Sequence, residues 1–97
     1  MLRSEARIVT DRPGRYLAQL CRHFSHKITT EWTDERGFAD FGFGTCTLLA
    51  EDGTLVLLAQ GTDEPGLSRV EYVVGDHLER FAARDGLTAR WSRPSPT

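Results

Sequence analysis

Long apolar runs are missing from this chain. Its longest unbroken apolar stretch is LVLLA at 55–59, whereas a membrane-spanning helix needs about 20 such residues. The first ten residues, MLRSEARIVT, carry charges at Arg3, Glu5 and Arg7 and do not have the pattern of a secretory signal peptide. We therefore expect a cytoplasmic protein with no membrane partner.

Positive charge and cysteine are also scarce. The 12 basic and 14 acidic residues give a formal net charge of −2, and a protein that holds a nucleic acid backbone needs a basic surface. We therefore expect no nucleic acid partner. In a reducing cytoplasm, Cys21 and Cys46 are predicted to be thiols packed as small hydrophobic side chains. A disulfide between them is the less favoured alternative.

The length of 97 residues allows one domain, which we expect over 4–92, followed by a disordered tail at 93–97. Apolar alternation and helical periodicity predict the order β-α-β-β-β-β-α-β. One helix is expected from a cap at Asp11 to His26, and a second from a cap at Thr62 or Asp63 to Gly86. The expected strands are 5–10, 28–32, 38–43, 45–51, 54–60 and 87–91.

This order predicts an α+β fold. Consecutive hairpins form an antiparallel sheet, and the two amphipathic helices must pack on one of its faces. The other face would then be a candidate surface for a ligand, a partner protein or a second copy of the chain. Trp32 and Phe38 are the aromatic residues that we expect on it.

The stretch CRHFSHK at 21–27 holds one cysteine and two of the three histidines. At about 100° per helical residue, Cys21 lies almost opposite His23 and belongs to the core. His23 and His26 lie about 60° apart and can converge. His77 falls inside the apolar arc of the second helix, where it could approach His23 across the groove between the helices.

His23, His26 and His77 are therefore candidate ligand-binding and metal-ligating residues, with iron or another divalent metal as the possible ion. Two ligands alone do not make a metal site, and Glu31, Asp40 or a water would have to complete one. The alternative for His77 is a half-buried histidine that donates to a backbone carbonyl or a carboxylate. No cofactor is required by the sequence.

Arg15 and Arg22 lie on one side of the first helix and are candidate ligand-binding residues for an anion. The alternative is that they belong to its solvated face. No catalytic residue is predicted, because no G-x-S-x-G elbow is present. GFGTC at 42–46 lies between strands rather than before a helix, so Gly42 and Gly44 are expected to allow a bend instead of cradling a phosphate.

Three segments resemble a bacterial family known as domain of unknown function 2218. They are ARIVTDRPGRYLAQLCRHFSHK, FGFGTCTLLAEDGTLVL and VVGDHLERFAARDGL with the following ARW. The resemblance implies a small α+β domain with His23, His26 and His77 as motif positions. The resemblance also implies that other members have tryptophan at the position of Phe43. It further implies that family members are encoded beside siderophore-interacting, flavin-dependent reductases.

Three functional hypotheses follow. The first is a non-enzymatic binding or accessory module in iron, siderophore or haem handling. In this hypothesis a homodimer is one expected state, and a siderophore-interacting flavin reductase is the expected partner. The second is a small enzyme with His77 as general base beside Asp40 or Glu31. The third is a protein-interaction subunit that binds through the exposed face of its sheet.

Overall fold

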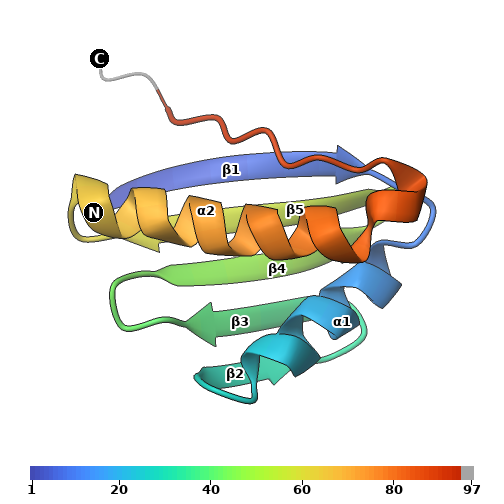
Figure 1. The fold of residues 1–97 in the computed structure, drawn as a ribbon, viewed down its shortest axis with the longest axis horizontal. Helices are drawn as coiled ribbons and strands as arrows, with labels where there is room; N and C mark the ends of the chain where they lie inside the picture. Colours follow the sequence, from blue (N-terminus) through green and yellow to red (C-terminus); the bar gives the residue numbers. More distant parts are fainter. Residues whose placement is uncertain (95–97) are drawn as a thin grey trace.

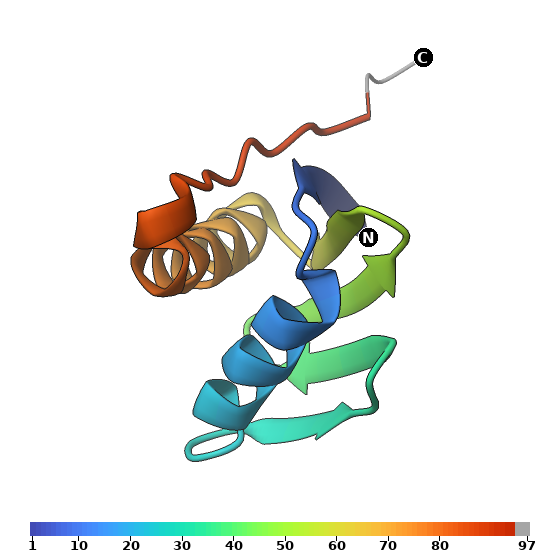
Figure 2. The same cartoon turned by 90° about the vertical axis from the view of Figure 1, so that its right-hand side faces the viewer.

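The computed structural model describes residues 1–94, and its elements follow the predicted order up to the second helix. A five-stranded antiparallel sheet has the strand order β1-β5-β4-β3-β2, and both helices lie on one of its faces (Figures 1 and 2). The elements are β1 (Leu2–Val9), α1 (Pro13–Phe24), β2 (Thr29–Trp32), β3 (Arg36–Asp40), β4 (Thr45–Glu51), β5 (Thr54–Gly61), α2 (Glu64–Phe81) and a 3-10 turn (Ala83–Asp85).

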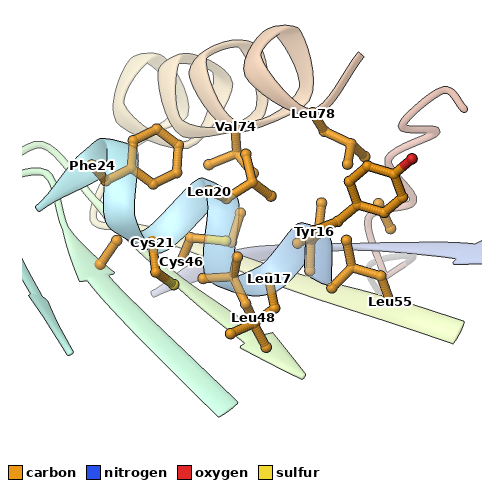
Figure 3. Close-up of a cluster of buried hydrophobic side chains, with 14 of the residues drawn as sticks. Tyr16, Leu17, Leu20, Cys21, Phe24, Cys46, Leu48, Leu55, Val74 and Leu78 are labelled. Atoms are coloured by element: carbon orange, nitrogen blue, oxygen red, sulfur yellow. The ribbon is translucent and has the colours of Figure 1, made fainter. Parts of the chain in front are cut away.

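The core fills the space between the sheet and the helices. Alternate residues of each strand point to this side, so β4 contributes Cys46 and Leu48, and β5 contributes Leu55 and Leu57. Figure 3 shows that the apolar stripe of α1 meets both the strands and α2. The helical part of the core consists of Tyr16, Leu17, Leu20, Cys21, Phe24, Leu67, Val70, Val74 and Leu78.

The helix boundaries differ from the predicted ones. Asp11 does not cap α1, because the residue at the cap position is Arg12 and no side chain makes a capping hydrogen bond. The helix also ends at Phe24, two residues before His26. The second helix begins as predicted, since the Asp63 carboxylate accepts a hydrogen bond from the Gly66 N–H at 2.8 Å. It ends at Phe81, and Gly86 instead ends the 3-10 turn, with a φ of 65°.

The segment at 87–91, expected as a last strand, does not pair as one. It lies against α2 instead, where the Ala89 N–H donates to the Glu79 carboxylate at 3.1 Å. Ser92 alone makes a bridge to Glu5 of β1. Arg93, which the sequence places in the tail, binds the Glu71 carboxylate at 2.8 Å. The last part of the expected tail, 95–97, lies outside the described residues.

The second face of the sheet carries no helix, as Figure 2 shows. Phe38 lies on this face as predicted, and 42% of its surface is exposed. Trp32 does not, because it pairs with Gly37, which faces α1. Charged residues such as Glu31 and Arg36 lie beside Phe38 on this face, so the face is partly charged and partly apolar. Within residues 1–94, no helix has the length and apolar content needed to cross a membrane.

Candidate functional site

A groove of about 490 Å³ opens where the C-terminal end of α1, the loop after β3 and the middle of α2 meet. Its volume lies in the range typical of small-molecule sites. The residues that line it come from three separate parts of the chain: 23–28, 41–43 and 69–77. They are His23, Phe24, His26, Lys27, Ile28, Phe41, Phe43, Arg69, Val73 and His77.

His23 and His77 approach each other at this groove, as the helical arithmetic suggests. Their ring centroids are 4.6 Å apart, and the ring planes are tilted by 41°. The His77 Nδ1 atom lies 2.7 Å from the Val73 carbonyl oxygen. Because a carbonyl can only accept, Nδ1 must carry a proton, and in the neutral ring Nε2 is left as an acceptor or ligand atom. His77 is therefore both half-buried with a backbone partner and part of a histidine pair.

His26 is less closely involved than predicted. Because α1 ends at Phe24, His26 lies in the following turn, where helical spacing no longer determines its direction. It lines the groove and, like His23, is exposed. Across residues 1–94, no group of three or more His, Cys, Asp or Glu side chains is placed to hold a metal ion. The expected set of three histidines is thus not assembled as a metal site, because His26 does not share the ring contact of His23 and His77.

The environment of His23 favours its neutral form. His23 remains exposed, but partial desolvation at the groove lowers its pKa below the ordinary value, and the nearby His77, His26 and Lys27 lower it further. Burial disfavours an imidazolium, and neighbouring positive charges repel it. A neutral imidazole can accept a hydrogen bond or ligate a metal through one nitrogen.

Aromatic rings form much of the groove wall. The Phe24 ring meets Phe41 edge-on, with centroids 5.1 Å apart, and meets His77 in the same way at 5.5 Å. The ring centroids of Phe41 and Phe43 lie 5.6 Å apart, and their ring planes are tilted by 31°. These rings therefore give the groove a broad, largely apolar surface that suits a flat ligand.

Phe41 and Phe43 reach the groove because β3 ends at Asp40 and the chain bends. Gly42 adopts a φ of 87° in this bend, which other residues rarely do. Gly44 lies so close to β5 and α2 that an added Cβ would be 2.5 Å from the Gln60 carbonyl oxygen and 2.6 Å from Val70. The role expected for Gly42 and Gly44 is confirmed, whereas the predicted extension of the strand to Phe43 is wrong.

The groove is rich in basic groups and has no carboxylate among its lining residues. The Arg69 guanidinium lies over the Phe43 ring, 4.3 Å from its centroid, in a cation–π contact. Glu31 and Asp40, proposed as partners of His77, belong instead to the helix-free face of the sheet, as their pairing with Phe38 and Thr45 requires. Neither is placed to orient His77 or to share a proton with it.

Arg15 and Arg22 are both exposed and lie outside the lining of the groove. Cys21 and Cys46 also take no part in it. Both are buried free thiols, and burial raises the pKa of Cys21 to about 11. They pack in the core, as the sequence predicts.

The sequence reasoning missed Lys27, Phe41 and Arg69 as groove residues. Arg69 lies between Leu67 and Val70 of the apolar stripe of α2, and its residue type predicts a solvent-facing side chain. Phe41 reads as part of a strand. A signal was present in the closely spaced aromatic residues around Gly42, since two aromatics flanking a glycine in a bend can point to the same side.

Taken together, these features describe a small α+β domain with one helix-covered sheet face and a histidine- and aromatic-lined groove. The pattern of the family described as "Uncharacterized protein conserved in bacteria (DUF2218)" matches residues 5–92, so the chain belongs to this family. The resemblance noted in the sequence is thereby confirmed.

A solved structure has the same fold. It is described as the NMR structure of PA4090 from Pseudomonas aeruginosa, is 38% identical to this chain, and superposes with a TM-score of 0.81. The similarity covers 100% of both chains. None of the curated proteins compared with the chain matches it.

Proposed function

We propose that this protein is a non-enzymatic binding module that takes an iron complex, a siderophore or haem, into the groove between α1 and α2. The observation that carries the proposal is the pair of facing imidazoles, His23 and His77, 4.6 Å apart beside an aromatic wall. The free thiols Cys21 and Cys46 fit a reducing compartment, so we assign the protein to the cytoplasm.

An iron complex fits this groove better than a bare ion. A structural metal site needs about four protein ligands and a catalytic one about three, whereas only two histidines come together here. Iron held by a siderophore or a porphyrin brings most of its own ligands. Such a complex needs one or two protein donors, and a histidine is a common axial ligand of haem iron. The hydrogen bond to Val73 uses Nδ1 of His77 and leaves the unprotonated Nε2 atom available to ligate iron.

The proposed partner is a flavin-dependent, siderophore-interacting reductase, which the family resemblance suggests. In this proposal the protein holds the ferric complex and presents it to the reductase, which performs the chemistry. The absence of a carboxylate from the lining of the groove supports a binding role over general-base catalysis by His77.

Thermal unfolding of the metal-free protein tests the proposal. Ferric haem, a ferric catecholate siderophore and ferric or zinc ions are added separately. A ligand present at 100 times its Kd stabilises the folded state by about 2.7 kcal/mol, so a haem or siderophore site raises the Tm by several degrees. The rise should be absent in the double variant His23→Ala/His77→Ala and retained in the control Arg22→Ala, which changes an exposed residue of α1 outside the groove. Equal Tm values with and without all four additions would overturn the proposal.

A further inference from the structure

We propose that the groove selects a planar aromatic acid, that is, one or two flat rings bearing a carboxylate or another acidic group. This inference rests on the proposed binding function and names the chemical class that the same site prefers. It does not depend on iron, because the features that carry it are the charges and the shape of the wall.

The charge of the groove differs from that of the rest of the chain. The whole protein has a formal charge of −2, yet the ten residues of the groove include Lys27, Arg69 and three histidines and no acidic residue. None of the ion pairs found within residues 1–94 involves Lys27 or Arg69. These two cations therefore have no acidic partner from the described chain, and an anionic ligand complements them.

The position of Arg69 is restricted as well. Its guanidinium lies over the Phe43 ring, and a guanidinium held against an aromatic face can still direct its N–H groups at a carboxylate. An acidic group bound there would lie next to the aromatic wall. The ligand must consequently combine a negative charge with an apolar body.

The wall favours a flat body. The ring planes of Phe41 and Phe43 are tilted by 31°, while the Phe24 ring meets both Phe41 and His77 edge-on. Offset-stacked and edge-on contacts between rings stabilise a pair of aromatic groups beyond the effect of the apolar area that they bury. A saturated ring of equal size and charge loses these contacts, because it has no π face or polarised ring edge.

The test is a titration of ¹⁵N-labelled protein with 2-naphthoate, followed by NMR. Two matched compounds serve as controls: 2-naphthalenemethanol, which has the ring but no charge, and decahydronaphthalene-2-carboxylate, which has the charge but no aromatic ring. We expect 2-naphthoate to bind at least about tenfold more tightly than either, a difference of about 1.4 kcal/mol. The shifted amides should belong to residues 23–28, 41–44 and 69–77.

Variants separate the groove from general attraction of anions. Arg69→Gln should weaken 2-naphthoate binding about tenfold and leave 2-naphthalenemethanol binding unchanged. Arg22→Gln removes an exposed cation outside the groove and should change neither. Equal affinities for the three compounds, or shifts confined to amides outside the groove, would overturn the inference.

Failure of this inference and failure of the proposed function give different results. If 2-naphthoate binds as described but haem and the siderophore do not stabilise the protein, the aromatic-acid site stands and the iron role falls. If haem or the siderophore stabilises the protein and 2-naphthoate does not bind in the groove, the iron role stands and the aromatic-acid preference falls.

Discussion

The imidazole rings of His23 and His77 lie 4.6 Å apart at the junction of α1 and α2. One nitrogen of His77 is committed to the Val73 carbonyl. The two rings therefore share a small space in which two positive charges would repel each other. Next to partial desolvation, the proximity of His77 is the main reason that the pKa of His23 is lowered.

The pKa of His23 should rise toward its ordinary value of 6.5 when His77 is replaced by Asn. Asn cannot take a proton in this range, and its amide can still donate to the Val73 carbonyl. The His23 Hε1 resonance, followed by NMR over pH, measures the pKa. His26→Asn is the matched control and should raise it less, since His77 lowers this pKa more than His26 does. An unchanged His23 pKa in His77→Asn would show that the charges do not interact.

The same lowered pKa makes stability depend on pH. In the unfolded chain the pKa of His23 has its ordinary value of 6.5, and in the folded protein it is lower. Between these two pH values the unfolded state therefore binds more protons than the folded state. The contribution of His23 to stability is thus fully present above that pH and falls as the pH is lowered toward the folded pKa. Urea unfolding at a series of pH values should show this fall, and His23→Gln should remove it.

Much of the fold could be predicted because it depends on local pattern. Alternation of apolar residues in β4 and β5 and the stripe at Leu17, Leu20 and Cys21 determine which side of each element is buried. The segment at 87–91 was predicted wrongly for a tertiary reason. It packs against α2 next to Gly75, whose missing side chain leaves space for Trp91 and Ala89, and sequence periodicity does not show which neighbour a segment will choose.

The histidine pair could be predicted, but the rest of the groove could not. The angular positions of His23 and His77 follow from helical geometry, which holds as long as each residue is inside its helix. His26 lies beyond the end of α1, so the same arithmetic fails there. Phe41 and Phe43 flank the bend at Gly42, which the sequence indicates, but their place in the groove also depends on packing of the loop against α2, where a Cβ added at Gly44 would lie 2.6 Å from Val70. No local pattern encodes that contact.

Gly37 lets α1 pack directly against β3. A Cβ added at Gly37 would lie 2.5 Å from the Sγ atom of Cys21, well inside normal contact distance. Gly37→Ala should therefore lower the free energy of unfolding by about 1–3 kcal/mol, the usual cost of overpacking a core. Urea denaturation measures this change.

A double-mutant cycle identifies the cause. Cys21→Ala removes the Sγ atom that the new methyl group would meet, so Gly37→Ala should cost less in the Cys21→Ala background than in the original chain. A coupling energy near zero would mean that the cost comes from another contact, such as Leu17, or from the backbone.

Cys21 and Cys46 should be unreactive in the folded protein. Figure 3 shows both in the core, where neither side chain is exposed to solvent. Burial raises the pKa of Cys21 to about 11 and that of Cys46 further, and only the thiolate is a good nucleophile. A disulfide-exchange reagent at pH 8 should label no thiol in native buffer and both in urea. Rapid labelling of either thiol in native buffer would contradict the burial described here.

Arg93 fastens the C-terminal segment to α2. Its guanidinium binds the carboxylates of Glu64 and Glu71, with one bond to the Ser68 hydroxyl at 3.1 Å. A hydrogen bond from Arg93 lowers the pKa of Glu64. Burial alone would raise the pKa of Glu71, but hydrogen bonds from Arg93 and Ser4 outweigh it and the pKa is lowered. Arg93→Gln should therefore loosen the end of the segment at neutral pH and speed hydrogen exchange of its amides, although the Ser92–Glu5 bridge and the Ala89–Glu79 hydrogen bond remain.

Acid should have the same effect on the original chain. Because both carboxylates have lowered pKa values, their interaction with Arg93 is fully present above the ordinary glutamate pKa of 4.5 and is lost as the pH falls through the lowered values. Trp91 beside Gly75 reports release through its fluorescence, measured in a Trp32→Phe background. The Arg93→Gln variant should show a smaller acid transition, since the interaction that acid breaks is already missing. A transition of equal size in both proteins would assign it to another group.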